Sequence, residues 1–226
     1  MLVFVAAERR ELEGLLAHID EVAKLDWPLD FAQRGRLNGR PVILAANGPG
    51  PKLAGDAVDA VERNEEMDAL VSIGFCGGLE PSLGACDIFV AREVNGVRTA
   101  PAPSSTRPFK TGKLLSIDRV VTTAAEKAVL AENADAVEME AAAVADRAER
   151  YRVPFYAVRI VTDTSEESFP LDFNTMRSSD GRFSRGKILA AALRSPGMLF
   201  PELIKLNKRT KRASQALGDF LADARF

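Results

Sequence analysis

Residues 136–163 read AVEMEAAAVADRAERYRVPFYAVRIVTD and contain a strand, a helix and a second strand in succession. The strands are the short apolar runs Ala136–Glu138 and Phe155–Val161, and the alanine-rich stretch between them has helical spacing from Glu140 to Tyr151. A helix between two strands is typical of a parallel sheet, which needs helices on both of its faces. We therefore expect an α/β protein with three layers, α/β/α, around a mixed, mostly parallel central sheet.

The same alternation of short apolar runs and helical patterns continues along most of the chain. Asn38-Gly39 lies between two such runs and predicts a tight hairpin. Because the chain shows no internal repeat and no linker, we expect a single domain over residues 1–226. The other strands are expected near residues 2–6, 31–37, 41–46, 69–73, 88–91 and 114–121, with helices at 8–18, after NGPGP (47–51) to 64, and up to 131. Residues 95–112 hold Pro101, Pro103 and Pro108 and predict a loop.

Composition excludes several classes of function. The 226 residues carry 30 Lys and Arg against 32 Asp and Glu, a net charge of −2, which argues against a nucleic-acid partner. One histidine, His18, and two cysteines are too few for a histidine metal cluster or a disulfide scaffold, so we expect no metal and no cofactor. The first residues lack a cationic leader, and no apolar run is long enough to span a membrane. These observations predict a cytoplasmic protein whose chemistry depends on carboxylates.

Three glycine-containing motifs differ in how strongly they indicate a ligand-binding site. Residues 181–188, GRFSRGKI, nearly match a nucleotide-phosphate loop, but Ile188 replaces the hydroxyl that binds magnesium and no strand precedes the motif, so we reject it. Gly48-Pro49-Gly50 follows a strand and begins a helix, which suits either an anion cradle or a plain turn. Residues 72–79, SIGFCGGL, predict a glycine-rich turn after a buried strand, where the backbone approaches a ligand closely or simply turns.

Carboxylates at strand ends are the most informative feature. Glu138 and Glu140 lie where a strand ends and a helix begins, Asp163 ends the strand Phe155–Val161, and Glu11 follows the first strand. Each has an ordinary explanation: Glu140 suits a helix dipole, Thr162-Asp163 suits a cap, Glu138 suits a structural role, and Glu11 suits a solvated helix. Because ligands collect where parallel strands end, their shared placement favours a functional site.

These residues resemble the nucleoside phosphorylase and nucleosidase superfamily. The segments AAERREL, NGPG, GFCGGL, AVEMEAAAVA and VRIVTDT occur in that family's order and approximate spacing, over roughly residues 1–195. The resemblance is greatest to the methylthioadenosine/S-adenosylhomocysteine nucleosidase branch. The short middle loop and GFCGG also resemble the hopanoid-associated phosphorylases, which release adenine from adenosylhopane. The resemblance implies a nucleoside phosphorylase-like fold and cleavage of a purine N-glycosidic bond, with adenine as the expected base.

The resemblance also implies roles for individual residues. Asp163 would protonate N7 of the purine, and Glu11 would activate water or stabilise the sugar cation. Glu140 would bind the ribose hydroxyls and Met139 would pack on the sugar. The remaining substrate contacts would be Glu138, Thr162, Val120, Val121, Phe75 and Cys76, and Gly48 and Gly74 would lie beside the phosphate or water site.

The chain departs from the hydrolytic pattern at two places. Phe75-Cys76 stands where hydrolytic members usually have Ser-Ala, and Val120 or Val121 replaces an aromatic residue that stacks on the purine. Whether phosphate or water attacks therefore stays open, with Arg34, Arg36 and Lys52 as candidate phosphate donors. The alternatives are a hydrolytic methylthioadenosine-type nucleosidase and a nucleoside-binding module without catalysis on the same fold.

Two segments bear on partners. The loop from Val97 to Phe109 has few charges, so it is either an ordinary surface loop or the lining for an apolar 5′ substituent, as in an adenosylhopane-like substrate. Near the C-terminus, apolar residues such as Leu206, Leu217 and Phe220 recur at helical spacing among Lys and Arg. Such a helix either packs on its own domain, the more common case, or lies on an anionic membrane. The resemblance implies a homo-oligomer.

Overall fold

The computed structural model describes residues 1–169, 172–178, 181–183 and 196–226. In these ranges the strands are β1 (Leu2–Ala6), β2 (Ile19–Lys24), β3 (Phe31–Leu37), β4 (Arg40–Ala46), β5 (Ala69–Gly78), β6 (Ile88–Val94), β7 (Val97–Arg98), β8 (Lys110–Ser116), β9 (Ala136–Glu138) and β10 (Phe155–Asp163). The helices are α1 (Arg9–Leu16), α2 (Pro51–Glu62), α3 (Ala124–Leu130), α4 (Ala141–Tyr151) and α6 (Pro196–Asp223), with a 3-10 turn, η1, at Phe173–Met176.

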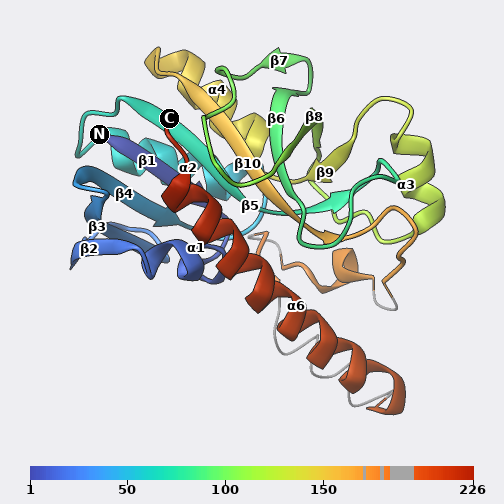
Figure 1. Ribbon diagram of the computed structural model, residues 1–226. Coiled ribbons are helices and arrows are strands. Elements are labelled where there is room, and N and C mark those ends of the chain that lie inside the picture. Colours follow the sequence, from blue (N-terminus) through green and yellow to red (C-terminus); the bar gives the residue numbers. More distant parts are fainter. Residues whose placement is uncertain (170–171, 179–180, 184–195) are drawn as a thin grey trace.

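The strands form one mixed sheet. Its order is β10-β6-β8-β9-β5-β1-β4-β3-β2, and β7 pairs with β6. Parallel pairs join β1 to β4 and β5, β5 to β10, and β8 to β6 and β9, while the remaining pairs are antiparallel. Because β10 pairs with β5 as well as β6, strands β5, β9, β8, β6 and β10 close into a ring. The sheet continues beyond this ring through β1, β4, β3 and β2, and β2 is its edge strand (Figure 1).

Helices cover both faces of the sheet, which confirms the three-layer α/β/α fold. On one face α2 and α4 pack on Val3, Val5 and Ile43 through Val58 and Val144. On the other face α1 and α6 pack on Phe4 and Leu44. Alternate residues of β1 thus belong to opposite cores, as expected for a strand that is buried on both sides. Figure 1 shows α1 and α6 together on one side of the sheet.

Most predicted elements occur close to their expected positions, and the hairpin is confirmed in detail. β3 and β4 pair in an antiparallel register that ends with Leu37 opposite Arg40. Asn38 and Gly39 between them have φ of 52° and 79°. Two consecutive residues with positive φ make the turn whose twist matches an antiparallel hairpin, which explains why Asn-Gly is used here.

The predicted elements differ from the structure in three places. β5 does not stop at Ile73 but continues to Gly78, so SIGFCGGL lies in a strand and not in a turn. The strand expected at 114–121 is β8, shifted to Lys110–Ser116, so that the loop at 95–112 is shorter and also contains β7. The edge strand β2 was not predicted, because most of its side chains are exposed and it lacks an apolar run. The rejected phosphate-loop motif has residues 184–188 outside the described residues.

The C-terminal half of α6 packs on its own domain, as the more common interpretation predicted. Ala213, Leu217 and Phe220 are fully buried in the core that α1 shares. Gly14 of α1 and Gly218 of α6 let the two helices meet backbone to backbone, because a methyl group at either position would overlap the opposite helix. The other half of α6 extends away from the sheet (Figure 1). Among the described residues, no helix is both long and apolar enough to cross a membrane.

Candidate active site

The predicted site residues follow strands whose carboxyl ends lie at one edge of the sheet. β1, β4, β5 and β10 are neighbours and run parallel. Glu11 lies in the helix after β1, Gly48 and Gly50 follow β4, and Asp163 ends β10. Gly48 N donates to Ala7 O at 2.8 Å, which joins the ends of β1 and β4. This edge therefore brings together residues from distant parts of the chain.

Glu11 is buried and held by the backbone. Its Oε1 accepts from Phe75 N at 3.0 Å and its Oε2 accepts from Glu8 N at 2.9 Å. Burial raises the pKa of Glu11, while the two backbone N–H groups lower it less. Its carboxylate oxygens keep further lone pairs, so Glu11 can accept a proton from a ligand hydroxyl or a water molecule.

A buried ion pair supports the start of α4. Glu138 and Arg159 each have side chains only 1% exposed, and Arg159 Nη2 lies 2.7 Å from Glu138 Oε2. The Glu138 carboxylate also accepts from the backbone N–H groups of Glu140 and Ala141, both at 2.9 Å, at the N-terminus of α4. Through these contacts Glu138 holds the backbone at the start of α4, next to Glu140.

Glu140 faces the glycine turn. Gly50 N donates to its Oε1 at 2.6 Å, so the residues that precede α2 and α4 meet here. Burial and the charges of Glu138 and Glu11 raise the pKa of Glu140 to about 8, although Gly50 N and Arg159 act in the opposite direction. Glu11, Glu138 and Glu140 therefore form one group of interacting carboxylates with Arg159 as a shared cation.

Asp163 lies on the other side of β5 and is paired with a lysine. Lys127 Nζ of α3 lies 2.6 Å from Asp163 Oδ2, and the two side chains are 0% and 9% exposed. Thr162 Oγ1 lies 2.9 Å from Asp163 Oδ1 and 3.2 Å from Cys76 O, so its one proton can go to either oxygen. Burial raises the pKa of Asp163, opposed by Lys127 and Thr162. A raised pKa suits an acid that must hold a proton near neutral pH.

Cys76 connects the two groups of charges. It is 3% exposed in β5, and its pKa is raised by burial and shaped by the charges of Arg159, Asp163, Glu138 and Lys127. All four charges are thus close to one buried thiol. Burial therefore favours the protonated form of this thiol.

The glycines of β5 leave room for the acids. A Cβ on Gly74 would lie 2.7 Å from Glu11 Oε1, and a Cβ on Gly77 would lie 2.9 Å from Asp163 Oδ2. In β10 the register against β5 slips between Val161 and Asp163, a bulge that leaves Thr162 as the extra residue. The close backbone approach predicted for SIGFCGGL is therefore an approach to the protein's own carboxylates.

The other predicted substrate contacts lie in different surroundings, some in the core and some half-buried. Phe75 donates its backbone N–H to Glu11, while its ring packs with the core between the sheet and α1 and α6. Val121 is 5% exposed in a small apolar cluster, so its side chain is core. Val120 is half-buried, and its backbone N–H and C=O both bind the side-chain amide of Asn174. Met139 is half-buried between the two glutamates.

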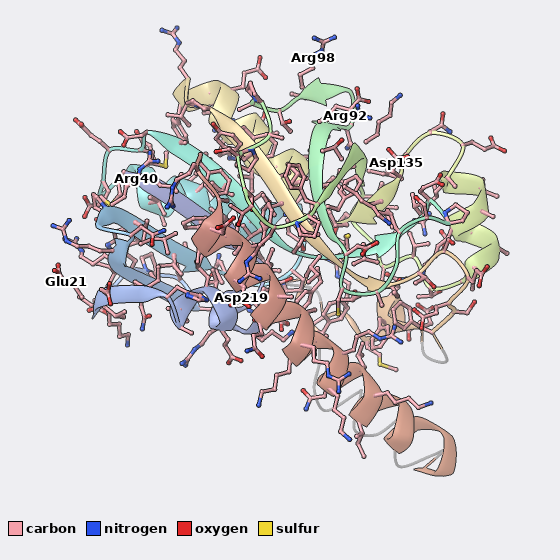
Figure 2. The ribbon with its side chains drawn as sticks, viewed as in Figure 1. Glu21, Arg40, Arg92, Arg98, Asp135 and Asp219 are labelled. Atoms are coloured by element: carbon pink, nitrogen blue, oxygen red, sulfur yellow. The ribbon has the colours of Figure 1, made fainter. Side chains whose placement is uncertain are left out.

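The predicted phosphate donors bind carboxylates at the surface. Arg34 pairs with Glu65, Lys52 pairs with Asp56, and Arg36 pairs with Glu21. Glu21 lies on β2 at the outer edge of the sheet, as Figure 2 shows.

Two arginines that sequence reasoning missed lie at the glycine turn. The Cβ position of Gly50 is 2.8 Å from Arg177 Nη2, and that of Gly48 is 3.5 Å from Arg182 Cγ. Arg177 pairs with Asp118 and Arg182 with Asp30.

Lys127 and Arg159 were also missed. Arg159 had a usable signal, since a lone charge inside the apolar run of β10 is unusual and points to a buried pair. Lys127 had none, because AAEKAVL reads as an ordinary solvated helix.

The loop after β7 starts at the end of β10 away from Asp163 and ends closer to it. Ala100 N donates to Phe155 O at the start of β10, and Ser104 pairs with Arg225 beyond α6. Asp163 ends β10 eight residues later, about 26 Å along the strand. At the other end of the loop, Phe109 precedes Lys110, whose Nζ lies 2.7 Å from Asp87 Oδ2, and Asp87 O accepts from Val161 N near the end of β10.

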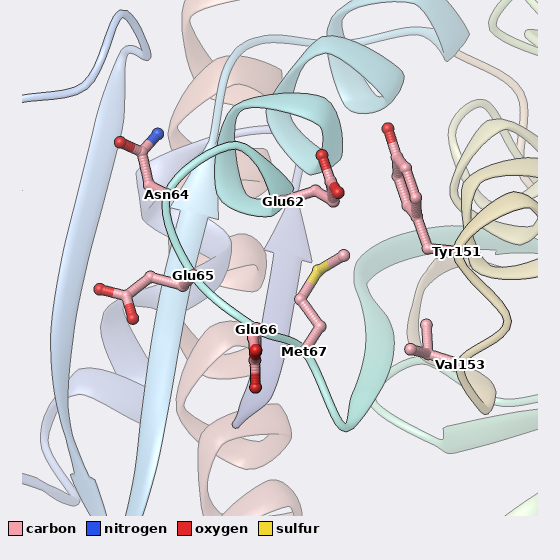
Figure 3. A pocket seen from close by; sticks show the side chains of 7 residues that line it. All are labelled: Glu62, Asn64, Glu65, Glu66, Met67, Tyr151 and Val153. Carbon is pink, nitrogen blue, oxygen red and sulfur yellow. The ribbon is translucent and has the colours of Figure 1, made fainter.

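A surface pocket of about 500 Å³ lies elsewhere (Figure 3). Its lining residues are Glu62, Asn64, Glu65, Glu66, Met67, Tyr151 and Val153. None of the candidate residues contributes to it. Because it lies at the ends of α2 and α4 away from their N-termini, it has no connection with the acids at the strand ends.

This chain is similar to known proteins in both its sequence and its fold. A family model described as "Phosphorylase superfamily" matches residues 2–108 and 97–193. The fold resembles a 5′-methylthioadenosine/S-adenosylhomocysteine nucleosidase from Neisseria meningitidis in complex with methylthio-immucillin-A, with 20% identity, TM-score 0.71, and coverage of 98% of this chain and 96% of that one.

Two more structures are similar. A putative nucleosidase of the same kind from Borrelia burgdorferi, bound to adenine, has 17% identity and TM-score 0.71, covering 99% of this chain and 98% of that one. A futalosine hydrolase mutant from Helicobacter pylori has 17% identity and TM-score 0.69, covering 97% and 96%. At these identities the likeness shows the fold.

Proposed function

The chain belongs to the phosphorylase superfamily, and on that basis we propose that it cleaves the N-glycosidic bond of a purine nucleoside, with adenine as the leaving base. The observation that carries the proposal is the convergence of Glu11, Glu140 and Asp163 at one edge of the sheet, from three distant segments. The ligands of the similar structures, adenine and methylthio-immucillin-A, support a small nucleoside as the substrate.

Asp163 is the proposed acid. Breaking the bond between sugar and purine leaves electron density on the base, and a proton delivered to N7 lets the base leave neutral. A protonated Asp163 donates from one oxygen, and its other oxygen accepts from the amino group of a 6-aminopurine. Thr162 orients the carboxyl group by its hydroxyl.

Glu140 and Glu11 act on the sugar. The Glu140 carboxyl group, held by Gly50 N, binds the ribose hydroxyls, and Met139 packs beside the sugar. The Glu11 carboxylate lies against Gly74 of β5. In this proposal it faces the positive charge that develops at the anomeric carbon of the sugar. Glu138 and Arg159 act indirectly because they hold the start of α4 and hence Glu140.

Water is the favoured nucleophile. The sugar side carries the carboxyl groups of Glu11, Glu138 and Glu140, and its buried cation, Arg159, is already paired with Glu138, so this side favours a neutral nucleophile over a phosphate dianion. Glu11 can accept the proton of an attacking water molecule.

Phosphorolysis is the second candidate, favoured by Arg177 and Arg182 beside Gly50 and Gly48. These guanidinium groups would have to leave Asp118 and Asp30 to bind phosphate, and such an exchange between carboxylate and phosphate partners is chemically reasonable.

An apolar 5′ substituent, as in an adenosylhopane-like nucleoside, stays part of the proposal as the finer choice of substrate. The end of the loop after β7, at Phe109, supports it, because Lys110 binds Asp87 near the end of β10 that carries Asp163. A single domain, a homo-oligomer and a cytoplasmic location are likewise proposals that follow from the family.

The test is to incubate the purified protein with adenosine, inosine, 5′-methylthioadenosine and 5′-alkyl adenosines, with and without phosphate, and to separate free base from nucleoside by chromatography. Adenine release without phosphate, with free ribose as the other product, supports hydrolysis. Release that requires phosphate and yields a sugar 1-phosphate supports the second candidate. Tight adenosine binding without base release in either condition would overturn catalysis in favour of a binding module.

A further inference from the structure

Lys127 is a buried cation beside Asp163, the proposed acid, and all three of its N–H donors have acceptors. Its Nζ lies 2.6 Å from Asp163 Oδ2, 2.6 Å from Thr164 O and 3.1 Å from Glu167 O. An ammonium group has three protons, so these three acceptors satisfy it completely. The side chain is 0% exposed, and the ring of Phe169 lies 5.8 Å from Nζ.

The acceptors of Lys127 come from a segment that is itself held in place. Glu167 accepts from both terminal nitrogens of Arg209 on α6, at 2.7 and 2.8 Å, and from Thr164 N at 2.9 Å. Arg209 also donates to Thr162 O at 2.7 Å. The residues after β10 thus bind Lys127 through Thr164 and Glu167, and Arg209 of α6 holds Glu167 in place.

Burying a lysine costs free energy unless its charge is paired and its protons are accepted. Here the carboxylate of the proposed acid, Asp163, pairs with the charge, and Asp163 Oδ2, Thr164 O and Glu167 O accept the three protons. A hydrogen bond from a neutral group, such as the one that Thr162 Oγ1 can donate at 2.9 Å, would orient Asp163 equally well. The charge of Lys127 therefore needs a reason beyond orientation.

We propose that Lys127 is a positioning residue for the reaction, which holds the carboxyl group of Asp163 and stabilises the carboxylate left after its proton moves to the departing base. This inference rests on the proposed function. In the step, the C1′–N9 bond breaks, its electron pair goes to the purine, and the cation left at C1′ forms a bond to water, whose proton passes to Glu11. The proton of Asp163 moves to N7, so the base leaves neutral and Asp163 becomes a carboxylate. Lys127 keeps its three protons throughout.

The pH dependence of this step depends on all charged groups that face Asp163. Lys127 on α3 is in contact with it, Glu167 follows β10, Arg209 reaches from α6, and the Cys76 thiol faces it from β5. Lys127 and Arg209 favour the carboxylate, and Glu167 disfavours it. Arg209 is neutralised by its contact with Glu167, so Lys127 is the main positive influence on Asp163.

The experiment compares wild type with Lys127→Met, Lys127→Arg, Asp163→Asn and the double variant Lys127→Met/Asp163→Asn. We expect Lys127→Met to lower kcat about 10- to 100-fold with little change in KM, as for the loss of support to a general acid. We also expect its loss of activity at high pH to move upward by about one pH unit or more, because Asp163 loses an opposite charge. Lys127→Arg keeps the charge and the wild-type profile.

Two comparisons separate this role from a structural one. If Lys127 acts through Asp163, the double variant releases base no more slowly than Asp163→Asn alone. Lys24→Met, which removes an exposed lysine from β2, controls for loss of a positive charge. Thermal unfolding checks that each variant folds, and Lys127→Gln replaces Lys127→Met if the latter does not.

An unchanged pH profile and kcat in a folded Lys127→Met or Lys127→Gln variant would overturn the inference. So would a double variant clearly slower than Asp163→Asn. If wild type releases base from no nucleoside, the proposed function fails instead. In that case the pH dependence of adenine binding, measured by calorimetry on wild type and Lys127→Met, still tests whether Lys127 controls the proton of Asp163. Identical dependences would overturn the inference.

Discussion

The carboxylate of Glu11 fills the space that a side chain on Gly74 would need, since a Cβ there would lie 2.7 Å from Glu11 Oε1. Gly74 lies opposite Arg159 in the pairing of β5 with β10, so this one position adjoins both the proposed sugar carboxylate and the buried arginine. A glycine in the interior of a strand weakens the strand, and here the loss is offset by room for a catalytic group.

Gly74→Ala should therefore displace Glu11, and it also strains the backbone, because Gly74 has φ of 154°. We expect base release to fall about 100-fold, the scale of a 1 Å misplacement of a catalytic group. The assay is initial-rate base release beside a thermal unfolding curve. Gly96→Ala is the control for backbone strain, because Gly96 also has a positive φ, 83°, and a methyl group there meets nothing within 4 Å. Equal activity of the Gly74 and Gly96 variants would contradict the role of Glu11.

Asp163→Asn should reduce base release to a slow residual rate and also lower the stability of the protein. The substitution leaves the Lys127 ammonium buried without its counter-charge, and removing one partner of a buried pair costs about 3–5 kcal/mol. Urea unfolding measures the loss. Adding Lys127→Met should recover most of the stability but none of the activity. Full activity of Asp163→Asn would remove Asp163 as the acid.

Glu140→Gln should make the protein more stable at high pH. The pKa of Glu140 is raised from 4.5 to about 8 in the folded protein. The stability that depends on its protonated form is therefore complete below pH 4.5 and is lost as pH rises towards 8. Glutamine stays neutral, so we expect a gain of about 1–2 kcal/mol at pH 8.5, as for relief of a poorly solvated polar group, and almost none at pH 5.

Urea unfolding at the two pH values tests this, together with base release, which should be lost. Glu149→Gln, an exposed carboxylate on the same helix, should show no such difference. A gain at pH 5 as large as that at pH 8.5 would show that the Glu140 charge is not the cause.

Arg159→Met should destabilise the protein by about 3–5 kcal/mol, because Glu138 would stay buried without a partner. Arg150→Met, which removes an exposed arginine from α4, should cost far less. Adding Glu138→Gln to Arg159→Met should restore part of the stability, as measured by urea unfolding. If the double variant is less stable than Arg159→Met, the pair is not the source of the effect.

The protein should not pellet with anionic liposomes. Ala213, Leu217 and Phe220 are buried against α1, so this part of α6 has no free apolar face to insert into a membrane. Co-sedimentation at low and moderate salt measures binding. Pelleting that disappears in a Lys208→Glu/Lys211→Glu variant would instead show that the exposed basic residues of α6 bind a membrane.

Local patterns in the sequence predicted most of the fold. The apolar runs of β1, β4 and β10, the Asn38-Gly39 hairpin and the helix after Glu140 each depend on residues within one short window, and periodicity reports on such windows. The candidate acids could be grouped because parallel strands end at a common edge, whatever their separation in the chain.

Tertiary structure alone decided which charges are neighbours. Lys127 meets Asp163 across 36 residues and Arg159 meets Glu138 across 21, and nothing in the local pattern of either lysine or arginine specifies such a partner. The continuation of β5 through its glycines also required β9 and β10 to pair with it. The loop after β7 starts beside Phe155, far from Asp163, and ends near Val161, and only the path of the whole strand β10 shows this. Charge pairing and burial arise from the closing of the sheet, which periodicity does not encode.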